Sequence, residues 1–262
     1  VLFRLLSSFM DARLSGVRMV IIDDASFVSE KIENIGPMNT ADVCAYFKSN
    51  RVFYTKNPKN IGVPKSWRRY YDDICDVKYT MSMTDKDIIL PGNGILRAAG
   101  KMDDDPTISL VVMPMLQIDR SGTHETKIEF PYSEKVSGKK FLEMYVNDPA
   151  LQHCSMWGLI RSSEIKKAGC PRDMRLRDQG LDDGFGIDVD LIFNIVCKND
   201  VAFEKTMHVK RSTVSGGTEK YPLTFSSTYY QYASRVVAEF EKLGYMSKRT
   251  AKTYRKWWLL LI

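Results

Sequence analysis

The sequence lacks the cysteine spacing of a zinc site or of a disulfide framework. Its five cysteines are scattered and never form a C-x-x-C pair: Cys44, Cys75, Cys154, Cys170 and Cys197. An odd number of isolated cysteines favours free thiols over structural bridges or metal ligands. We therefore expect a cytoplasmic protein, because the cytosol keeps thiols reduced.

Long apolar runs and internal repeats are also missing. No stretch of about 18 apolar residues occurs, so we expect no membrane-spanning helix. With 262 residues, of which 44% are hydrophobic and 27% charged, the chain has an ordinary composition for one large globular domain. The net charge of +6 suits an anionic partner, which leaves a nucleotide, a phospholipid and a nucleic acid open.

The first half of the chain alternates helical and strand-like patterns. The patterns predict helices near 1–15, 40–48 and 65–75, and strands over 17–22, 51–55 and 77–83. Such alternation predicts an α/β fold in which helices flank a mixed, mainly parallel sheet. A longer strand is expected over Thr107–Ile118, followed by a hairpin tip at 119–123 and a returning strand over 127–130.

The second half is predicted to be richer in helix. Helical spacing is present at 139–147, 162–168, 188–196 and 225–243, and the last of these places six apolar residues on one face: Phe225, Tyr229, Tyr232, Val236, Phe240 and Leu243. The segment 169–186 is rich in Gly, Asp and Arg and has no periodicity. Because long irregular segments inside a domain are more often functional than idle, we expect it near the site.

The domain boundaries follow from these patterns. We expect a domain over 1–217, with a nucleotide-binding half at about 1–106 and an acceptor half at 107–217, and a helical C-terminal extension over 218–262. Helical spacing is already present in the first ten residues. We therefore expect that the first strand of the fold is missing from the chain.

Carboxylates follow two of the predicted strands. Asp85 and Asp87 come after the run 77–83 and before a Pro-Gly turn, and Asp23 and Asp24 end the run 17–22. Ligands of open α/β sheets bind where strands end, and carboxylates two residues apart can bind one hard cation together. The alternative is that these acids are solvated surface groups.

Several motifs in order carry a resemblance to a known family. Residues 20–26, 57–62 and 84–91 follow the V-D-D-G-S, N-x-G and D-x-D-D signatures of inverting, family-2-type nucleotide-sugar glycosyltransferases. Segments at 157–161, 186–191 and 208–212 fall where that family has its acceptor-side segment, its E-D catalytic motif and its diphosphate-binding stretch. The sequence resembles this family over about 1–217, and the resemblance implies a GT-A fold.

The sequence also departs from the family pattern. Ala25 replaces the usual glycine, Ile187 replaces the glutamate of E-D, and the opening strand with its P-x-Y-N segment is absent. Only one aspartate follows Lys86, and an alignment on Ile88–Pro91 would put Thr84 where an aspartate is expected. These departures affect the roles of individual residues more than the fold.

The resemblance implies roles on the donor side. Asp24 or Asp23 would contact the base and ribose of the nucleotide, since a carboxylate accepts hydrogen bonds from N–H groups and hydroxyls. Asn60 and Gly62 would shape a turn near the nucleotide, and Arg211 would pair with the diphosphate. The alternatives are solvated acids and an ordinary turn.

The resemblance also implies a metal site for Mn²⁺ or Mg²⁺. Asp87 would bind the ion, Asp85 would support the ion or the sugar ring, and His208 would be a further ligand or touch the diphosphate. One or two carboxylates suffice, because diphosphate oxygens and water complete the shell. A structural role is the alternative for His208.

A catalytic base and an acceptor contact complete the implied site. Asp188 would remove the proton of the acceptor hydroxyl, with Asp183 and Asp182 as alternatives in the preceding loop. Trp157 and Gly158 would lie on the acceptor side, where the indole ring could stack on a sugar. Core packing is the alternative for Trp157.

The C-terminal segment 248–262 combines basic residues with an aromatic and aliphatic end: Lys248, Arg249, Lys252, Tyr254, Arg255, Lys256, Trp257, Trp258 and Leu259–Ile262. Such a helix suits the anionic inner face of a membrane. The alternative is a helix that docks on the domain or on a second subunit.

The expected function is a metal-dependent, inverting transfer of a sugar from a nucleotide-diphosphate donor to a hydroxyl of a glycan or lipid-linked acceptor. By resemblance, this reaction belongs to cell-surface polysaccharide synthesis. A sugar-phosphate nucleotidyltransferase and a non-enzymatic basic module that binds membranes or nucleic acid are the alternatives. A homo-oligomer is possible, and no nucleic acid is expected under the main hypothesis.

Overall fold

The computed structural model describes residues 1–27, 29–119, 123–168, 187–212 and 234–259. The helices are α1 (Leu2–Asp11), α2 (Thr40–Tyr46), α3 (Val63–Arg69) with a π-helical turn (Tyr70–Ile74), α4 (Gly94–Asp104), α5 (Gly138–Asn147), α6 (Pro149–Ser155), α7 (Ser162–Ala168), α8 (Ile187–Val196), a helix over 234–242, and α10 (Lys248–Leu259).

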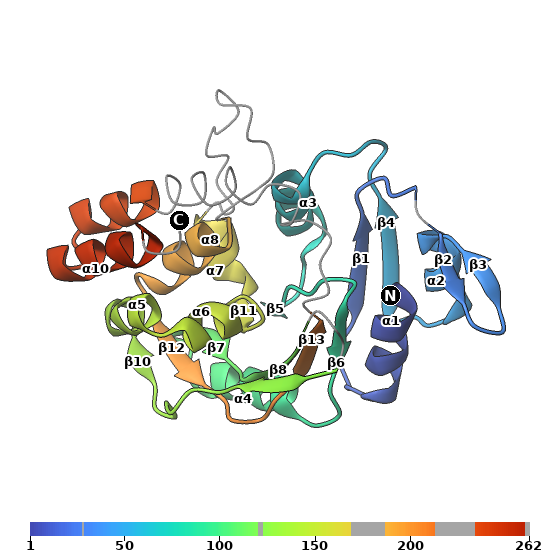
Figure 1. Cartoon of the computed structure of the whole chain (residues 1–262), viewed down its shortest axis with the longest axis horizontal. Coiled ribbons are helices and arrows are strands. Elements are labelled where there is room, and N and C mark those ends of the chain that lie inside the picture. Colours follow the sequence, from blue (N-terminus) through green and yellow to red (C-terminus); the bar gives the residue numbers. More distant parts are fainter. Residues whose placement is uncertain (28, 120–122, 169–186, 213–233, 260–262) are drawn as a thin grey trace.

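The strands are β1 (Met19–Asp23), β2 (Glu30–Ile32), β3 (Gly36–Met38), β4 (Val52–Lys56), β5 (Tyr79–Thr80), β6 (Asp87–Ile89), β7 (Ile108–Val112), β8 (Met115–Ile118), β9 (Glu125–Ile128), β10 (Val136–Ser137), β11 (Leu159–Arg161), β12 (Asp200–Phe203) and β13 (Val209–Ser212). They form the sheets β1-β4, β10-β12-β7-β11-β5, β6-β13-β8-β9 and β2-β3. Figure 1 shows the β1-β4 sheet with α1 and α2 at one end of the molecule and α5 to α8 with α10 at the other.

The prediction of an α/β fold with mixed sheets flanked by helices is confirmed, but the prediction of a mainly parallel arrangement was wrong. Of the nine strand pairings between described residues, three are parallel and six antiparallel. The parallel pairs are β1-β4, β7-β12 and β8-β13. Each parallel pair lies in a different sheet, and β11, between β7 and β5, is antiparallel to both of these neighbours.

The β1-β4 sheet is covered by the two helices that precede its strands. Helix α1 buries Leu5 and Phe9, and α2 begins at a capping box in which the side chains of Asn39 and Asp42 each accept from the other's backbone N–H. The Phe3 ring of α1 lies 5.1 Å from the Phe47 ring just after α2. Both helices therefore pack on the same face of the sheet.

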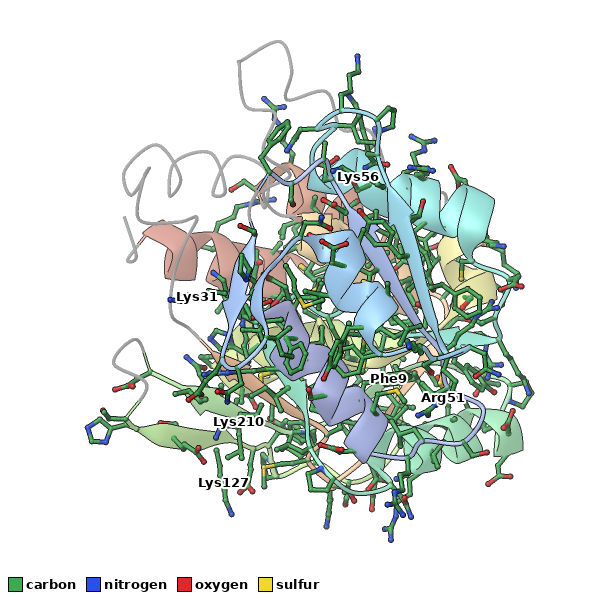
Figure 2. The ribbon with its side chains drawn as sticks, turned by 90° about the vertical axis from the view of Figure 1, so that its right-hand side faces the viewer. Phe9, Lys31, Arg51, Lys56, Lys127 and Lys210 are labelled. Atoms are coloured by element: carbon green, nitrogen blue, oxygen red, sulfur yellow. The ribbon has the colours of Figure 1, made fainter. Side chains whose placement is uncertain are left out.

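The Arg51 side chain packs at the amino end of this sheet. The Arg51 guanidinium lies 4.9 Å from the centre of the Phe9 ring and donates to the Leu14 carbonyl at 3.0 Å. Figure 2 shows Arg51 beside Phe9, with Lys56 at the far end of β4. The carboxyl ends of β1 and β4, where Asp23 pairs in register with Lys56, thus lie at the other end of the sheet from this contact.

Two apolar cores meet at β7, which is buried along its whole length. Leu110 and Val112 belong to the core beneath α5 and α8, whereas Ile108 and Val111 belong to the core beneath α1 and α4. A strand buried on both faces explains the continuous apolar run in the sequence. The packing of β7 between the two cores fixes the position of the strands that carry the site.

The C-terminal helices share the first of these cores. Val236 and Phe240 are buried as the helical pattern predicted, but Leu243 is 57% exposed and its predicted burial was wrong, because the helix ends at residue 242. In α10, Ala251 and Tyr254 are buried, and Arg255 pairs with Glu241 at 2.9 Å. Helix α10 therefore docks on the domain, as one of the two alternatives predicted. Phe225, Tyr229 and Tyr232 lie outside the described residues.

Other expected elements differ in extent. The strand expected over 107–118 is two strands in different sheets, because Pro114 lacks an N–H and interrupts the ladder. The strand expected over 77–83 shortens to the two residues of β5, and the helix α4 was missed. The hairpin of β8 and β9 is confirmed.

None of the helices in the described ranges has the length and apolar character needed to cross a bilayer. The four cysteines that the structure describes are free thiols, and Cys170 lies outside those ranges.

Candidate functional site

The Asp24 carboxylate, just beyond the end of β1, holds the loop 57–62. Its Oδ1 accepts from the Asn57 side chain at 2.8 Å and from the Ile61 backbone at 2.9 Å, and its Oδ2 accepts from the Gly62 backbone at 2.8 Å. The Asn60 side chain also accepts from the Gly62 backbone, at 3.2 Å. The structure thus brings the predicted donor-side residues Asp24, Asn60 and Gly62 together.

Hydrogen bonds favour the ionised form of Asp24. Burial by itself raises the pKa of the carboxyl, but the donors on Ile61, Asn57 and Gly62 outweigh it, so the pKa lies below its ordinary value. Two of these donors are main-chain N–H groups of one loop. Deprotonation of Asp24 and closure of the loop 57–62 are therefore coupled.

Asp23 is engaged differently, on the other side of the same strand end. It is 4% exposed, and it accepts from the Ser26 backbone at 2.7 Å and from the Tyr54 hydroxyl at 2.8 Å. Burial raises the pKa of Asp23, yet these hydrogen bonds bring it below the ordinary value, while burial and the Asp23 carboxylate raise the pKa of Tyr54 to about 12. Asp23 thus locks β1 to β4.

Ala25 stands where the resembled family has glycine, and the backbone conformation of this residue explains why glycine is usual there. Its φ is +59°, in the left-handed region that glycine adopts without strain. Gly62 has a φ of +82° and is the residue immediately before α3, as the turn motif predicted. The departure at Ala25 therefore keeps the shape of the turn after Asp24.

Asp85 and Asp87 lie in different surroundings. Asp85 is exposed, whereas Asp87 begins β6 and is fully buried. The Asp87 Oδ2 accepts from the Thr84 backbone at 2.6 Å and from the Trp157 indole at 2.9 Å. Its Oδ1 is buried and has no hydrogen-bond partner.

Trp157 joins three of the predicted site residues. Its indole N–H binds Asp87, its carbonyl contacts the His208 Nε2 at 2.7 Å, and the Arg211 guanidinium lies 4.0 Å from the centre of its ring. Arg211 also faces Asp87 in the β6-β13 register. Because the residue is only 9% exposed, Trp157 packs and positions its neighbours here, and its stacking on an acceptor sugar stays a prediction.

His208 and Gly158 are buried parts of this cluster. Burial lowers the pKa of His208 to about 4, against the opposing effect of the Trp157 and Pro114 carbonyls, so the imidazole is neutral at pH 7. Its Nδ1 makes no hydrogen bond. A Cβ at Gly158 would lie 2.8 Å from the Val111 carbonyl, so Gly158 permits close packing of β11 on β7.

One oxygen of this cluster has the chemistry of a ligand for a divalent cation. In the ranges that the structure describes, no three histidine, cysteine or acidic side chains gather closely enough to hold a metal by themselves. Magnesium and manganese in nucleotide sites need only one or two carboxylates beside phosphate oxygens and water. The Asp87 Oδ1 is a buried carboxylate oxygen that lacks a partner, and its chemistry suits that role.

The predicted catalytic acids are only partly described. Asp188 lies in the first turn of α8, but the position of its side chain is outside the description, and Asp182 and Asp183 fall outside the described residues. Asp190 is fully buried and accepts from the Asn194 side chain at 2.8 Å. The role of Asp188 therefore remains a prediction.

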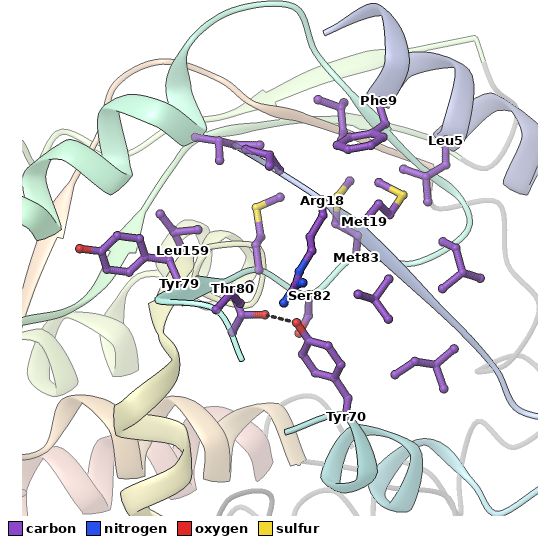
Figure 3. Close-up of a pocket in the computed structure, with 18 of the residues that line it drawn as sticks. Leu5, Phe9, Arg18, Met19, Tyr70, Tyr79, Thr80, Ser82, Met83 and Leu159 are labelled. Atoms are coloured by element: carbon purple, nitrogen blue, oxygen red, sulfur yellow. Dashed lines mark hydrogen bonds between the residues drawn. The ribbon is translucent and has the colours of Figure 1, made fainter. Parts of the chain in front are cut away.

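A cavity of about 700 Å³ lies between β1 and the segment that carries β5, as Figure 3 shows. Asp24 and Asp85 line it, whereas Asp87, Trp157 and His208 do not. The predicted site residues thus form two described groups, one around Asp24 and one around Trp157.

Sequence reasoning missed several residues that hold these groups. Asn57 is fully buried and joins Asp24, Ser66 and Arg69, and Tyr54 holds Asp23. The polar run that directly follows β4 could have indicated Asn57, because side chains at strand ends meet at one edge. No sequence signal links Trp157 to Asp87, which lie 70 residues apart.

The Trp157 hydrogen bond can be tested with Trp157→Phe, which keeps an aromatic ring but removes the N–H donor. We expect the free energy of unfolding in urea to fall by about 1–3 kcal/mol, because a buried carboxylate loses a donor. Trp67→Phe is the matched control at a half-buried tryptophan. Equal losses in both variants would show that ring area, and not the hydrogen bond, matters.

The Asp24 hydrogen bonds predict a pH dependence. Because its pKa in the folded protein lies below the ordinary 3.8, the stabilisation is complete above that value and is lost as the pH falls through the lower pKa. We expect Asp24→Asn to lower the melting temperature at pH 7 and to flatten its decline below about pH 4. Asp85→Asn, at an exposed carboxylate, should keep the wild-type profile, and an unchanged Asp24→Asn profile would contradict the assignment.

Comparison with known proteins gives the fold a precedent. The crystal structure of S. aureus TarS 1–349 in complex with UDP-GlcNAc matches with a TM-score of 0.66 and 12% identity, over 92% of this chain and 62% of that one. The complex of the same TarS fragment with UDP matches with a TM-score of 0.61 and 12% identity, over 92% and 61%. A longer TarS structure matches with a TM-score of 0.62 and 13% identity, over 92% and 37%.

No protein-family model and no curated protein matches the sequence. The chain spans about three fifths of the length of the TarS fragment, and the two sequences share 12% identity. At this identity the match concerns the fold alone, and it shows that the chain has a fold like that of S. aureus TarS.

Proposed function

We propose that the protein is a metal-dependent, inverting glycosyltransferase that transfers a sugar from a nucleotide-diphosphate donor to a hydroxyl of a glycan or lipid-linked acceptor. The observation that carries the proposal is the match over 92% of the chain to a structure that holds UDP-GlcNAc. Asp23 and Asp24 at the carboxyl end of β1 support it, because open α/β sheets bind ligands there.

The donor-binding part of the proposal assigns the nucleotide to the turn after β1 and the loop 57–62. Asp24 lines the cavity and has spare acceptor capacity at Oδ2, which receives one hydrogen bond from Gly62. In the proposal this carboxylate binds the base or ribose. Asp23 holds the turn through Tyr54 and contributes to donor binding from behind it.

The proposed metal site is Asp87, with Asp85 as a second carboxylate and His208 as a further ligand. The unpartnered Asp87 Oδ1 and the neutral imidazole of His208 support this choice. When bound, Mn²⁺ or Mg²⁺ acts as a Lewis acid that neutralises charge on the leaving diphosphate. Arg211, opposite Asp87 in the β6-β13 register, adds positive charge for the same diphosphate.

The proposed catalytic base is Asp188, in the first turn of α8. Inversion requires a base on the face of the sugar opposite the leaving group. In the proposal the Asp188 carboxylate takes the proton of the acceptor hydroxyl as its oxygen attacks the anomeric carbon, while the bond from that carbon to the diphosphate breaks. Asp183 and Asp182 are the alternatives for this role.

The proposal places the acceptor beside Trp157 and Gly158, and the protein in the cytoplasm at the inner face of a membrane. Lys248, Arg249 and Lys252 are exposed on α10, whose Ala251 and Tyr254 pack inward. This basic face supports contact with anionic lipid, where a lipid-linked acceptor of surface polysaccharide would lie.

Donor binding can be tested by thermal shift with UDP and UDP-GlcNAc, each with and without Mn²⁺. At a ligand concentration of about 100 times Kd, we expect the melting temperature to rise by about 5–10 °C. Asp87→Asn should remove the part of the shift that depends on Mn²⁺ and keep the part that UDP gives alone, because its neutral amide binds a cation poorly. Asp11→Asn, at a carboxylate on α1 outside the site, is the control variant.

Two results would contradict the proposal, one from this screen and one from a binding experiment. A shift with nucleoside triphosphate and sugar phosphate, without one for UDP-GlcNAc, would indicate nucleotidyl transfer. Steeply salt-dependent binding to RNA or anionic vesicles, with no response to any nucleotide, would indicate a basic binding module.

The catalytic base can be tested by UDP release from UDP-GlcNAc, with water as the acceptor. Asp188→Asn should keep the thermal shift of the donor and slow UDP release by about 10²–10⁴-fold, because the base acts on the acceptor and not on the donor. Asp183→Asn is the matched comparison. Full activity in Asp188→Asn together with loss in Asp183→Asn would assign the base to Asp183.

A further inference from the structure

Strand β9 ends the four-stranded sheet and leaves one edge open. The sheet order is β6-β13-β8-β9, and within the described ranges no strand pairs with the far side of β9. Figure 2 shows Lys127 on this strand, in the pale green hairpin that projects at the lower left. Glu125, Thr126 and Lys127 are exposed. An open edge presents unpaired N–H and C=O groups to which another strand can add.

The hydrogen-bond pattern of the hairpin identifies these groups. The Asp119 N–H donates to the His124 carbonyl at 3.0 Å, so these two residues, which continue the β8-β9 register, form a hydrogen-bonded pair. Hydrogen-bonded and non-hydrogen-bonded pairs alternate along an antiparallel ladder. The backbone of Thr126 therefore bonds to β8, whereas the N–H and C=O groups of Glu125 and Lys127 point outward from the edge of the sheet.

The side chains on this edge are complementary to a second copy of the same edge. Glu125 and Lys127 lie two residues apart and therefore on one face of the sheet. When two copies of β9 pair antiparallel about Thr126, Glu125 of each protomer faces Lys127 of the other. A shift of two residues would place Glu125 opposite Glu125 or Lys127 opposite Lys127, and like charges directly opposite are destabilising. One register thus satisfies both the outward backbone groups and the charges.

A lysine on a nearby strand extends this charge pattern. Lys210 of β13 forms an ion pair with Glu125 of the same chain. Lys210 also lies in one row with Lys127, because both are in register with Leu116 of β8. In the paired edges, each Glu125 lies between Lys210 of its own chain and Lys127 of the other. The charges then alternate in sign across the contact, whereas charges of one sign would repel a second copy.

We propose that β9 is a self-association surface: the β9 edges of two copies pair antiparallel, with Thr126 at the two-fold axis, and join two four-stranded sheets into one of eight strands. The axis is perpendicular to the sheet, so the face that carries Asp87 and Arg211 lies on the same side in both copies. Because β13 is two strands from β9, the two copies of β13 lie five strand spacings, or about 24 Å, apart. The dimer therefore presents both candidate sites on one side.

The proposal can be tested by sedimentation velocity on the protein and two charge variants. We expect the weight-average mass to rise toward that of a dimer between about 10 µM and 1 mM, because small interfaces are weak and transient. Glu125→Lys and Lys127→Glu should each stay monomeric over this range, since each places like charges opposite each other. An equimolar mixture of the two variants should dimerise again, because the two lysines of one variant face the two glutamates of the other.

The register can be tested by cross-linking Thr126→Cys under mild oxidation. Opposite residues of a non-hydrogen-bonded pair have Cα atoms about 4.5 Å apart, a distance that a disulfide can bridge, so we expect two copies to be linked. Ser133→Cys, at an exposed residue outside β9, is the matched control and should not link. Addition of Lys127→Glu to Thr126→Cys should abolish the link, because it removes the complementary charges.

A wild-type protein that stays monomeric up to about 1 mM would overturn the proposal, and a strand of another protein would then be the alternative partner of this edge. Dimers that persist in both charge variants, or a mixture of the variants that does not associate, would also overturn it. None of these measurements uses UDP, a metal ion or sugar transfer, so the self-association surface and the proposed function can fail separately.

Discussion

The hydrogen bond between the Trp157 indole and the buried Asp87 carboxylate is the contact on which the site depends. A carboxylate without solvent is costly unless donors satisfy it, and Asp87 has the Thr84 backbone and this indole on one oxygen. The same tryptophan contacts His208 through its carbonyl and Arg211 through its ring. One residue therefore positions an acid, a neutral imidazole and a guanidinium, and it leaves the second Asp87 oxygen without a partner.

The same physical principle operates at the end of β1. Asp24 is held by three donors from the loop 57–62, and Asp23 is held by the Ser26 backbone and the Tyr54 hydroxyl. These acids first stabilise the ends of the strands, and their remaining acceptor capacity is what a ligand can use. These two roles explain why the acids at the end of β1 are buried or half-buried and not freely solvated.

Part of this arrangement could be predicted from the sequence. The apolar run ending in Asp23 placed that acid at the end of a strand, and the Asn-x-Gly turn placed Gly62 in a left-handed conformation, because these features depend on local spacing. The expectation that Asp87 follows a strand was wrong, because the run 77–83 forms only the two residues of β5 and Asp87 begins β6. The contact between Trp157 and Asp87 could not be predicted, since it depends on how β11 packs across 70 residues of chain. The mainly parallel sheet was wrong for a related reason: periodicity predicts strands but not the direction in which β6 and β11 join their neighbours.

The central claim is that a divalent cation and a nucleotide diphosphate meet at Asp87, next to Trp157. Paramagnetic broadening by Mn²⁺ measures this distance directly, through the indole N–H signals of a ¹⁵N-labelled protein with the Trp157 signal assigned from Trp157→Phe. In the presence of UDP, the account predicts that substoichiometric Mn²⁺ broadens the Trp157 signal and that Mg²⁺ restores it by competition. A Trp157 signal that stays sharp while UDP is bound and Mn²⁺ is present would contradict it.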